Sequence, residues 1–204
     1  MDPYININDI EKFLKNIIKI KNKEKIDYIL QKTDYIEDIF FKNKKEIRKI
    51  LTKKQNEKID TFECLIIEFQ KSMFLKEKNI YNKYFFNYLI KKYYNIDYEY
   101  ALIILLKNKK FFYEKIHSVG DIDSANIYSR KIINLIFEKK ANGFILIHNH
   151  PSGDYSPSKQ DIDITDNLGT ISSYLGLSFF DSLIVGKTNV YSILQKKILN
   201  IYYD

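Results

Sequence analysis

The spacing of apolar residues differs between the two halves of the chain. In the first half they recur at the three- and four-residue intervals of an amphipathic helix, as in Ile10, Phe13, Leu14, Ile17 and Ile18. All six glycines lie after residue 119, and Pro3 is the only proline before Gly120. Because glycine and proline are the residues that most often interrupt helices, their absence favours continuous helical segments. We therefore predict an all-helical region over residues 1–94.

The second half alternates between strand-like and helix-like patterns. Short runs of apolar, β-branched and aromatic residues predict strands, and longer segments with helical spacing lie between them. The predicted strands are 98–106, 111–119, 144–147, 177–180, 181–185 and 190–194, and the predicted helices run from Asp123 or Ser124 to Lys140 and from Pro157 onward. This alternation predicts an α/β fold with one central sheet over residues 95–204.

One turn in this half concentrates side chains that bind metals. His148 and His150 directly follow the apolar run 144–147 and are two residues apart, so both imidazoles leave the strand on the same side. Pro151 stops the strand, and Asp161 follows ten residues later. The chain has only three histidines, and two of them fall in this turn. Two imidazoles and a carboxylate suit zinc and leave a fourth position for water, as in catalytic zinc sites.

The same segment also has a simpler interpretation as the beginning of a helix. Ser158 and Asp161 have the spacing of a capping box. Ser156 followed by Pro157 is an equally good N-cap and first helical residue. We therefore expect this segment to begin a helix whether or not it binds a metal.

The motif and its flanks resemble a known family. The pattern His-x-His-Pro, six residues, Ser, two residues, Asp is similar to the metal signature of the JAB/MPN metalloenzyme superfamily, and it is formed by His148, His150, Pro151, Ser158 and Asp161. The flanking segments 141–143, 175–177 and 181–186 resemble the RadC branch of that superfamily. The resemblance covers about Glu99 to Tyr191. It implies an α/β fold of the α+β type, a cytidine-deaminase-like mixed sheet flanked by helices and preceded by the helical region, and it implies Zn²⁺ as the cofactor.

The resemblance also implies a mechanism and the residues that perform it. The superfamily uses a glutamate on an earlier strand to take a proton from the metal-activated water. Glu99 and Glu114 are both candidates; we favour Glu99, at the start of a buried strand, and expect Glu114 to be a solvated strand-edge carboxylate. Ser158 is expected to donate a hydrogen bond to the developing oxyanion, and Asn149 and Ser152 to orient the histidines. The implied activity is cleavage of peptide or isopeptide bonds in a polypeptide substrate.

Charge leaves a second class of function open. Residues 1–94 hold 21 Lys and Arg against 14 Asp and Glu, a net charge of +7, whereas residues 95–204 are neutral. A basic half is typical of nucleic-acid contact, but interleaved acidic residues are equally typical of solvated helix faces. The resemblance adds a helix-hairpin-helix module, although the stretch 52–58 lacks the glycine of such a hairpin. The alternative function is therefore a non-enzymatic, DNA-associated protein, linked to DNA repair, with a structural or vestigial metal site.

Composition bounds the environment of the protein. No apolar run approaches the ~20 residues needed to cross a bilayer, and we recognise no secretion signal. Cys64 is the only cysteine, which excludes a disulfide within the chain and fits a reducing cytosol. We expect a cytoplasmic protein without a membrane partner. We expect Cys64 to be a core residue, carried by a helix spanning 61–73, and not a nucleophile.

Overall fold

The computed structural model describes residues 7–77, 81–93, 96, 98–119, 125–150 and 152–199. By its internal contacts the chain forms two compact units, Met1–Phe69 and Gln70–Asp204. The boundary lies within one long helix, α4 (Lys53–Lys76), so that α5 (Lys83–Tyr93) belongs to the second unit. The domain limits 1–94 and 95–204 therefore differ from the limits of these compact units, and they stay a prediction.

The regular elements in the described residues of the first unit are all helical. Its elements before α4 are α1 (Ile7–Phe13), the π-helical turn η1 (Leu14–Ile18), α2 (Lys23–Gln31), the 3₁₀ turn η2 (Ile36–Ile39) and α3 (Lys44–Ile50). Ile10, Leu14 and Ile18 are fully buried, whereas Ile17 is 43% exposed. The apolar stripe predicted from the sequence thus exists, but its buried members are spaced by four residues.

The second unit is built on a mixed six-stranded sheet with the order β2-β1-β3-β4-β5-β6. The strands are β1 (Tyr100–Lys107), β2 (Lys110–Val119), β3 (Gly143–Asn149), β4 (Ser178–Val185), β5 (Val190–Ser192) and β6 (Lys197–Leu199). Only the β3–β4 pair is parallel, because α7 (Lys159–Leu175) carries the chain back between them. The predicted fold class, an α+β mixed sheet with a helical N-terminal region, is confirmed.

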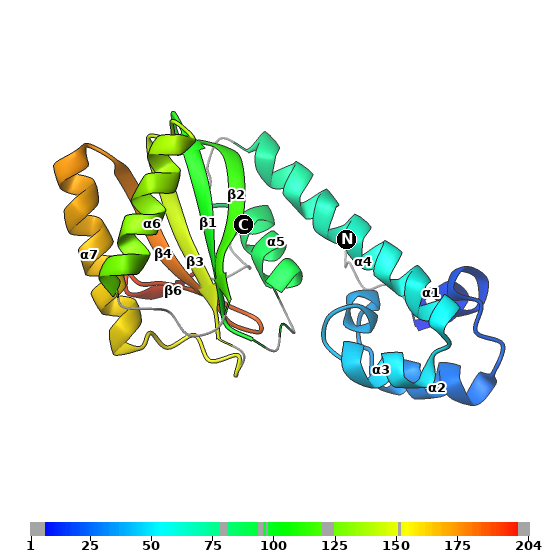
Figure 1. The fold of residues 1–204 in the computed structure, drawn as a ribbon. Coiled ribbons are helices and arrows are strands. Elements are labelled where there is room, and N and C mark those ends of the chain that lie inside the picture. Colours follow the sequence, from blue (N-terminus) through cyan, green and yellow to red (C-terminus); the bar gives the residue numbers. More distant parts are fainter. Residues whose placement is uncertain are drawn as a thin grey trace. The chain divides into compact units, whose positions relative to one another are not determined.

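Helices cover both faces of the sheet. Figure 1 shows α7 and α6 (Ala125–Glu138) on one face and α5 on the other. The predicted capping residues of α6, Asp123 and Ser124, lie outside the described residues. Because a strand alternates its side chains, every second residue of β1 and β3 points to the α6–α7 side. These residues form the core there: Ala101, Ile103, Leu105, Phe144 and Leu146.

Two expectations about the surface can be compared with the structure. Cys64 is exposed, so its assignment to the core was wrong; the helical pattern of α4 did not reveal which side of this helix is covered. Among the described residues, no helix is both long and apolar enough to span a bilayer.

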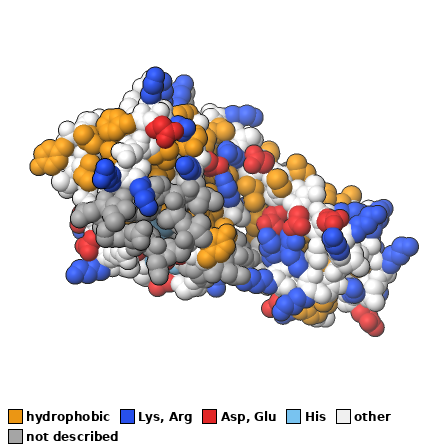
Figure 2. Space-filling view, viewed as in Figure 1, with side chains coloured by type: hydrophobic (Ala, Val, Ile, Leu, Met, Phe, Trp, Pro, Cys, Tyr) orange, Lys and Arg blue, Asp and Glu red, His pale blue; other side chains and the backbone are white. Residues whose placement is uncertain are grey.

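Most of the basic excess of residues 1–94 lies in their last part, beyond the boundary of the first compact unit. Residues 1–69 hold 15 Lys and Arg against 13 Asp and Glu, a net charge of only +2, and residues 70–94 carry the remaining +5. On the face of the helical unit drawn in Figure 2, acidic side chains lie among the basic ones. This mixture matches a solvated helical surface more closely than a continuous basic patch.

Candidate metal centre

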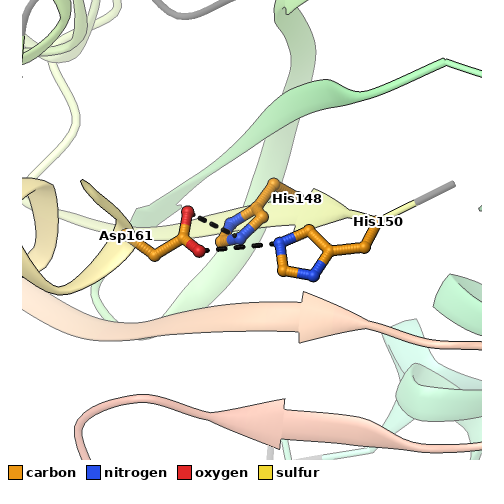
Figure 3. A group of neighbouring side chains, drawn as sticks. All are labelled: His148, His150 and Asp161. Carbon is orange, nitrogen blue, oxygen red and sulfur yellow. Dashed lines mark ion pairs between the residues drawn. The ribbon is translucent and has the colours of Figure 1, made fainter. Parts of the chain in front are cut away.

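His148, His150 and Asp161 converge where β3 ends and α7 begins. Each offers one ligand atom, and these three atoms all lie within 4.8 Å of one another. His148 Nε2 is 3.0 Å from Asp161 Oδ1, and His150 Nε2 is 3.5 Å from Asp161 Oδ2. Figure 3 shows both imidazoles turned toward the one carboxylate. The structure thus brings together the three residues that the sequence singled out as metal ligands.

The pairing of β3 positions the two histidines, and the first turn of α7 positions Asp161. His148 is paired with Ala101 on one side and Ile184 on the other, and its side chain is only 4% exposed. Period-two alternation then places His150 on the same side of the strand. Pro151 lies outside the described residues. Asp161 is the third residue of α7, and its side chain is 5% exposed.

Helix capping fixes the orientation of Asp161. Ser158 is the N-cap of α7, and the predicted capping box is present. The backbone N–H and the hydroxyl of Ser158 both donate to Asp161 Oδ2, each over 2.7 Å, and Asp161 N donates to Ser158 Oγ over 3.2 Å. Ser156 as N-cap was wrong, because the helix begins only at Lys159. Capping and metal binding are therefore compatible, since Oδ2 serves the cap while Oδ1 faces His148.

The electrostatics of the group favour an anionic carboxylate. Burial alone would raise the pKa of Asp161, but the neighbouring His148, His150 and Ser158 lower it far below its usual range. Asp161 in turn raises the pKa of His150, against the effect of burial, and the charge of Glu99 adds to this rise. The site therefore combines metal-ligating atoms with negative charge in a largely buried position.

One buried atom in this group lacks a well-directed partner. His148 Nε2 makes no hydrogen bond of acceptable geometry, although Asp161 Oδ1 is 3.0 Å away. A buried nitrogen left in this way is costly, and a cation shared by the imidazoles and the carboxylate would satisfy it. The donor set of two nitrogens and one carboxylate oxygen also fits zinc.

Glu99 lies beside this group. It is half-buried and immediately precedes β1. The antiparallel register pairs Ala101 with His148 as its last pair, so Glu99 and His150 each lie two residues beyond this pair on the same end of the two strands. The rise that the charge of Glu99 causes in the pKa of His150 agrees with this placement. Its role as the base stays a prediction, as does the oxyanion role of Ser158, whose hydroxyl is bonded to Asp161 here.

Glu114 belongs to the other face of the sheet. Its partner in β1 is Ile104, which alternates with the core residues that face α6 and α7. Its carboxylate accepts hydrogen bonds from Lys71 over 3.0 Å, from Lys92 over 2.7 Å and from the hydroxyl of Tyr88 over 2.6 Å. The expectation of a solvated carboxylate was wrong, because the side chain is 17% exposed and paired with two lysines. Glu114 joins α4 and α5 to β2.

The segment after His150 packs against residues 186–191, and the sequence did not predict these contacts. Gly153 adopts φ +80°, where a side chain is strained, and a Cβ there would meet the Lys187 side chain at 2.6 Å. A Cβ on Gly186 would lie 3.0 Å from the carbonyl oxygen of Gly153. The rings of Tyr155 and Tyr191 stack at 6.4 Å. The only sequence signal was a glycine in each segment, which did not reveal that the two segments meet.

Comparison with known proteins adds an independent line of evidence. The family model described as the RadC-like JAB domain matches residues 80–198, more than half of the chain. A UPF0758 protein of Shewanella baltica is 32% identical over 115 residues, which are 56% of this chain and 51% of that protein. UPF0758 proteins of Desulforudis audaxviator and Clostridium novyi are 33% and 34% identical over 102 residues, half of this chain and 44% and 45% of those proteins. The chain thus matches about half the length of these curated relatives.

Proposed function

Since this chain belongs to the family of RadC-like JAB domains, we propose that it is a zinc-dependent metallohydrolase that cleaves peptide or isopeptide bonds. The observation that carries the proposal is the convergence of His148, His150 and Asp161 within 4.8 Å. When bound, zinc supplies Lewis-acid chemistry and lowers the pKa of water from near 16 toward ~7. The donor set leaves a position for water, as a catalytic site requires.

The remaining roles follow from the residues around the three ligands. Glu99, whose charge acts on His150, accepts a proton from the attacking water and returns it to the leaving amine. Ser158 holds the carboxylate of Asp161 with its hydroxyl, and the same hydroxyl donates to a developing oxyanion once it turns away from Asp161. Hydrolysis of an amide needs both a base for the water and an acid for the amine, and one glutamate performs both in turn.

A direct test combines metal analysis with an unbiased search for cleavage. The purified full chain is loaded with zinc and incubated with a peptide library and with synthetic branched peptides that carry Gly–Lys isopeptide bonds. New termini are then identified by mass spectrometry. We expect zinc-dependent cleavage that is lost together with the metal in the His150→Ala variant. Full zinc occupancy in that variant, or cleavage that survives removal of the metal, contradicts the proposal; zinc binding without any cleavage favours the non-enzymatic alternative.

A further inference from the structure

Asn149, the last residue of β3, binds the backbone on both sides of Glu99. We propose that Asn149 is a positioning residue, which holds Glu99 at the metal centre by extending the β1–β3 ladder with its side-chain amide. The consequence for catalysis rests on the proposed function above, whereas the clamp itself does not. The sequence had suggested another role for Asn149, the orientation of the histidines.

Two hydrogen bonds define the clamp. The backbone N–H of Tyr100 donates to Asn149 Oδ1 over 3.1 Å, and Asn149 Nδ2 donates to the carbonyl oxygen of Tyr98 over 3.2 Å. Asn149 is 3% exposed, and its bond to the Tyr100 N–H is buried, whereas its bond to the Tyr98 carbonyl is only partly buried. Among the described residues, its side chain makes these bonds and none to either histidine. Asn149 therefore acts on the segment that contains Glu99.

The position of the clamp explains why a side chain is needed. The last backbone pair between β1 and β3 is Ala101 with His148, and Asn149 itself is paired with Val185 of β4. A primary amide carries an acceptor and donors like those of a peptide group, so it can continue the ladder for one more step. Leucine could make neither bond, and aspartate could keep only the one to Tyr100.

Holding the backbone at residues 98 and 100 fixes the direction of Glu99. Because side chains alternate along an extended chain, Glu99 points to the same side as Ala101, which is the side of α6 and α7. Ala101 lies opposite His148, so the carboxylate is directed toward the metal ligands. Without the clamp, the residues before β1 have no described hydrogen bond to β3 that would hold this direction.

The chain contains a matched control at the other end of β3. Asn142, which precedes Gly143, accepts a hydrogen bond from Asn108 N over 2.9 Å and donates to Asn108 Oδ1 over 3.1 Å. It thus ties the start of β3 to the turn of the β1–β2 hairpin through two hydrogen bonds of its side-chain amide, one to the backbone and one to the side chain of Asn108. Asn142→Ala removes as many hydrogen bonds as Asn149→Ala, but at the opposite end of β3, seven residues before Asn149.

The clamp is tested by amide hydrogen exchange, measured by NMR on the full chain. We expect the Tyr100 amide to exchange at least about tenfold faster in Asn149→Ala than in the wild type, and to be unchanged in Asn142→Ala, since only the first removes its acceptor. Equal protection of Tyr100 in the wild type and in Asn149→Ala overturns the proposal. This measurement is made on the metal-free chain as well, so it decides the clamp even if the protein binds no metal.

The link to the metal is tested with Co²⁺ as a visible probe. We expect Glu99→Gln to alter the absorption spectrum of the Co²⁺-loaded protein, Asn149→Ala to reproduce that change, and the double variant to show no further change. Hydrolysis in Asn149→Ala should fall roughly 10²-fold in kcat with KM nearly constant, as for a misplaced catalytic group. A Co²⁺ spectrum of Asn149→Ala identical to that of the wild type, or strictly additive effects, overturns the positioning role.

If Asn149→Ala does not fold, Asn149→Asp replaces it: the Tyr100 amide should stay protected from exchange while the change in the Co²⁺ spectrum persists.

Failure of the proposed function gives a different result. A protein that binds neither zinc nor Co²⁺ contradicts the metal centre, whereas rapid exchange of Tyr100 in Asn149→Ala still confirms the clamp. Conversely, a protein that binds metal and cleaves peptides, but whose Tyr100 amide is indifferent to Asn149→Ala, contradicts the clamp alone.

Discussion

Ser158 and Asp161 are bound to each other in both directions at the beginning of α7. Ser158 donates to Asp161 Oδ2 through its N–H and its hydroxyl, while Asp161 donates through its own N–H to Ser158 Oγ. A capping box normally ends with glutamate or glutamine. The shorter aspartate makes the same bonds and still presents Oδ1 to His148. The interaction that begins the helix is therefore the one that orients a metal ligand.

We expect Ser158→Ala to weaken both the helix and the metal site. Loss of an N-cap costs about 1 kcal/mol in the free energy of unfolding, and loss of a partner that orients a ligand weakens metal binding by about tenfold or more. Chemical denaturation and competition with a chelator measure the two effects. Ser156→Ala is the control, because Ser156 does not cap α7. Equal zinc affinity in the wild type and in Ser158→Ala contradicts this role.

Replacing each of the two candidate glutamates by glutamine should have different effects on hydrolysis. Glu99→Gln should keep zinc but lose hydrolysis by 10²-fold or more, as for a removed general base, whose contribution is about 10²–10⁴-fold. Glu114→Gln should keep the activity of the folded protein, because Glu114 lies on the opposite face of the sheet. Turnover on a cleaved library peptide and zinc content measure both. The assignment is wrong if Glu99→Gln remains fully active while Glu114→Gln does not.

Glu114 should instead determine part of the stability and its dependence on pH. Burial raises the pKa of Glu114, but hydrogen bonds from Lys92, Tyr88 and Lys71 outweigh this and hold it below its ordinary value of 4.5. A pKa that is lower in the folded state means that the carboxylate stabilises the protein above about pH 4.5, and that this contribution is lost as the pH falls through the folded-state value.

Glu114→Gln should therefore reduce the free energy of unfolding by about 2 kcal/mol at pH 7, the size of a hydrogen bond to a charged group. The difference from the wild type should shrink as the pH falls from 4.5 toward the lower folded-state pKa, because the unfolded wild type takes up the proton first and the folded protein follows. Urea denaturation at several pH values measures it. Glu138→Gln is the control, since the Glu138 side chain is 66% exposed and its pair with Lys139 contributes little. A difference that is constant with pH would show that packing, not charge, is responsible.

The features that could be predicted from the sequence are local, and those that could not are contacts between distant segments. Strand alternation and helix capping act over a few residues, so the convergence of His148, His150 and Asp161 followed from spacing. Contacts between distant segments carry no such local pattern. Asn149 binds residues 49 and 51 positions earlier, and Lys71 reaches Glu114 across 43 positions. The clamp on Glu99 and the lysine pair around Glu114 therefore became visible only once the strands and helices were placed.

Zinc should stabilise the folded protein, and this stabilisation should depend on the carboxylate of Asp161. A ligand that binds only the folded state adds about 2.7 kcal/mol to the free energy of unfolding at 100 times its Kd. We expect this zinc-dependent gain in the wild type, its reversal by a chelator, and its absence in Asp161→Asn, which retains the size of the side chain but loses its charge.

Asp163→Asn provides the matched control for this experiment. It makes the same chemical change two residues along α7, at an exposed position outside the three converging ligands. Thermal unfolding with and without zinc, followed for the three proteins at one protein concentration, gives the comparison. Zinc should raise the Tm of the wild type and of Asp163→Asn alike. A gain that persists in Asp161→Asn would mean that zinc binds elsewhere on the chain, and the three converging side chains would then be a hydrogen-bonded helix start without a metal.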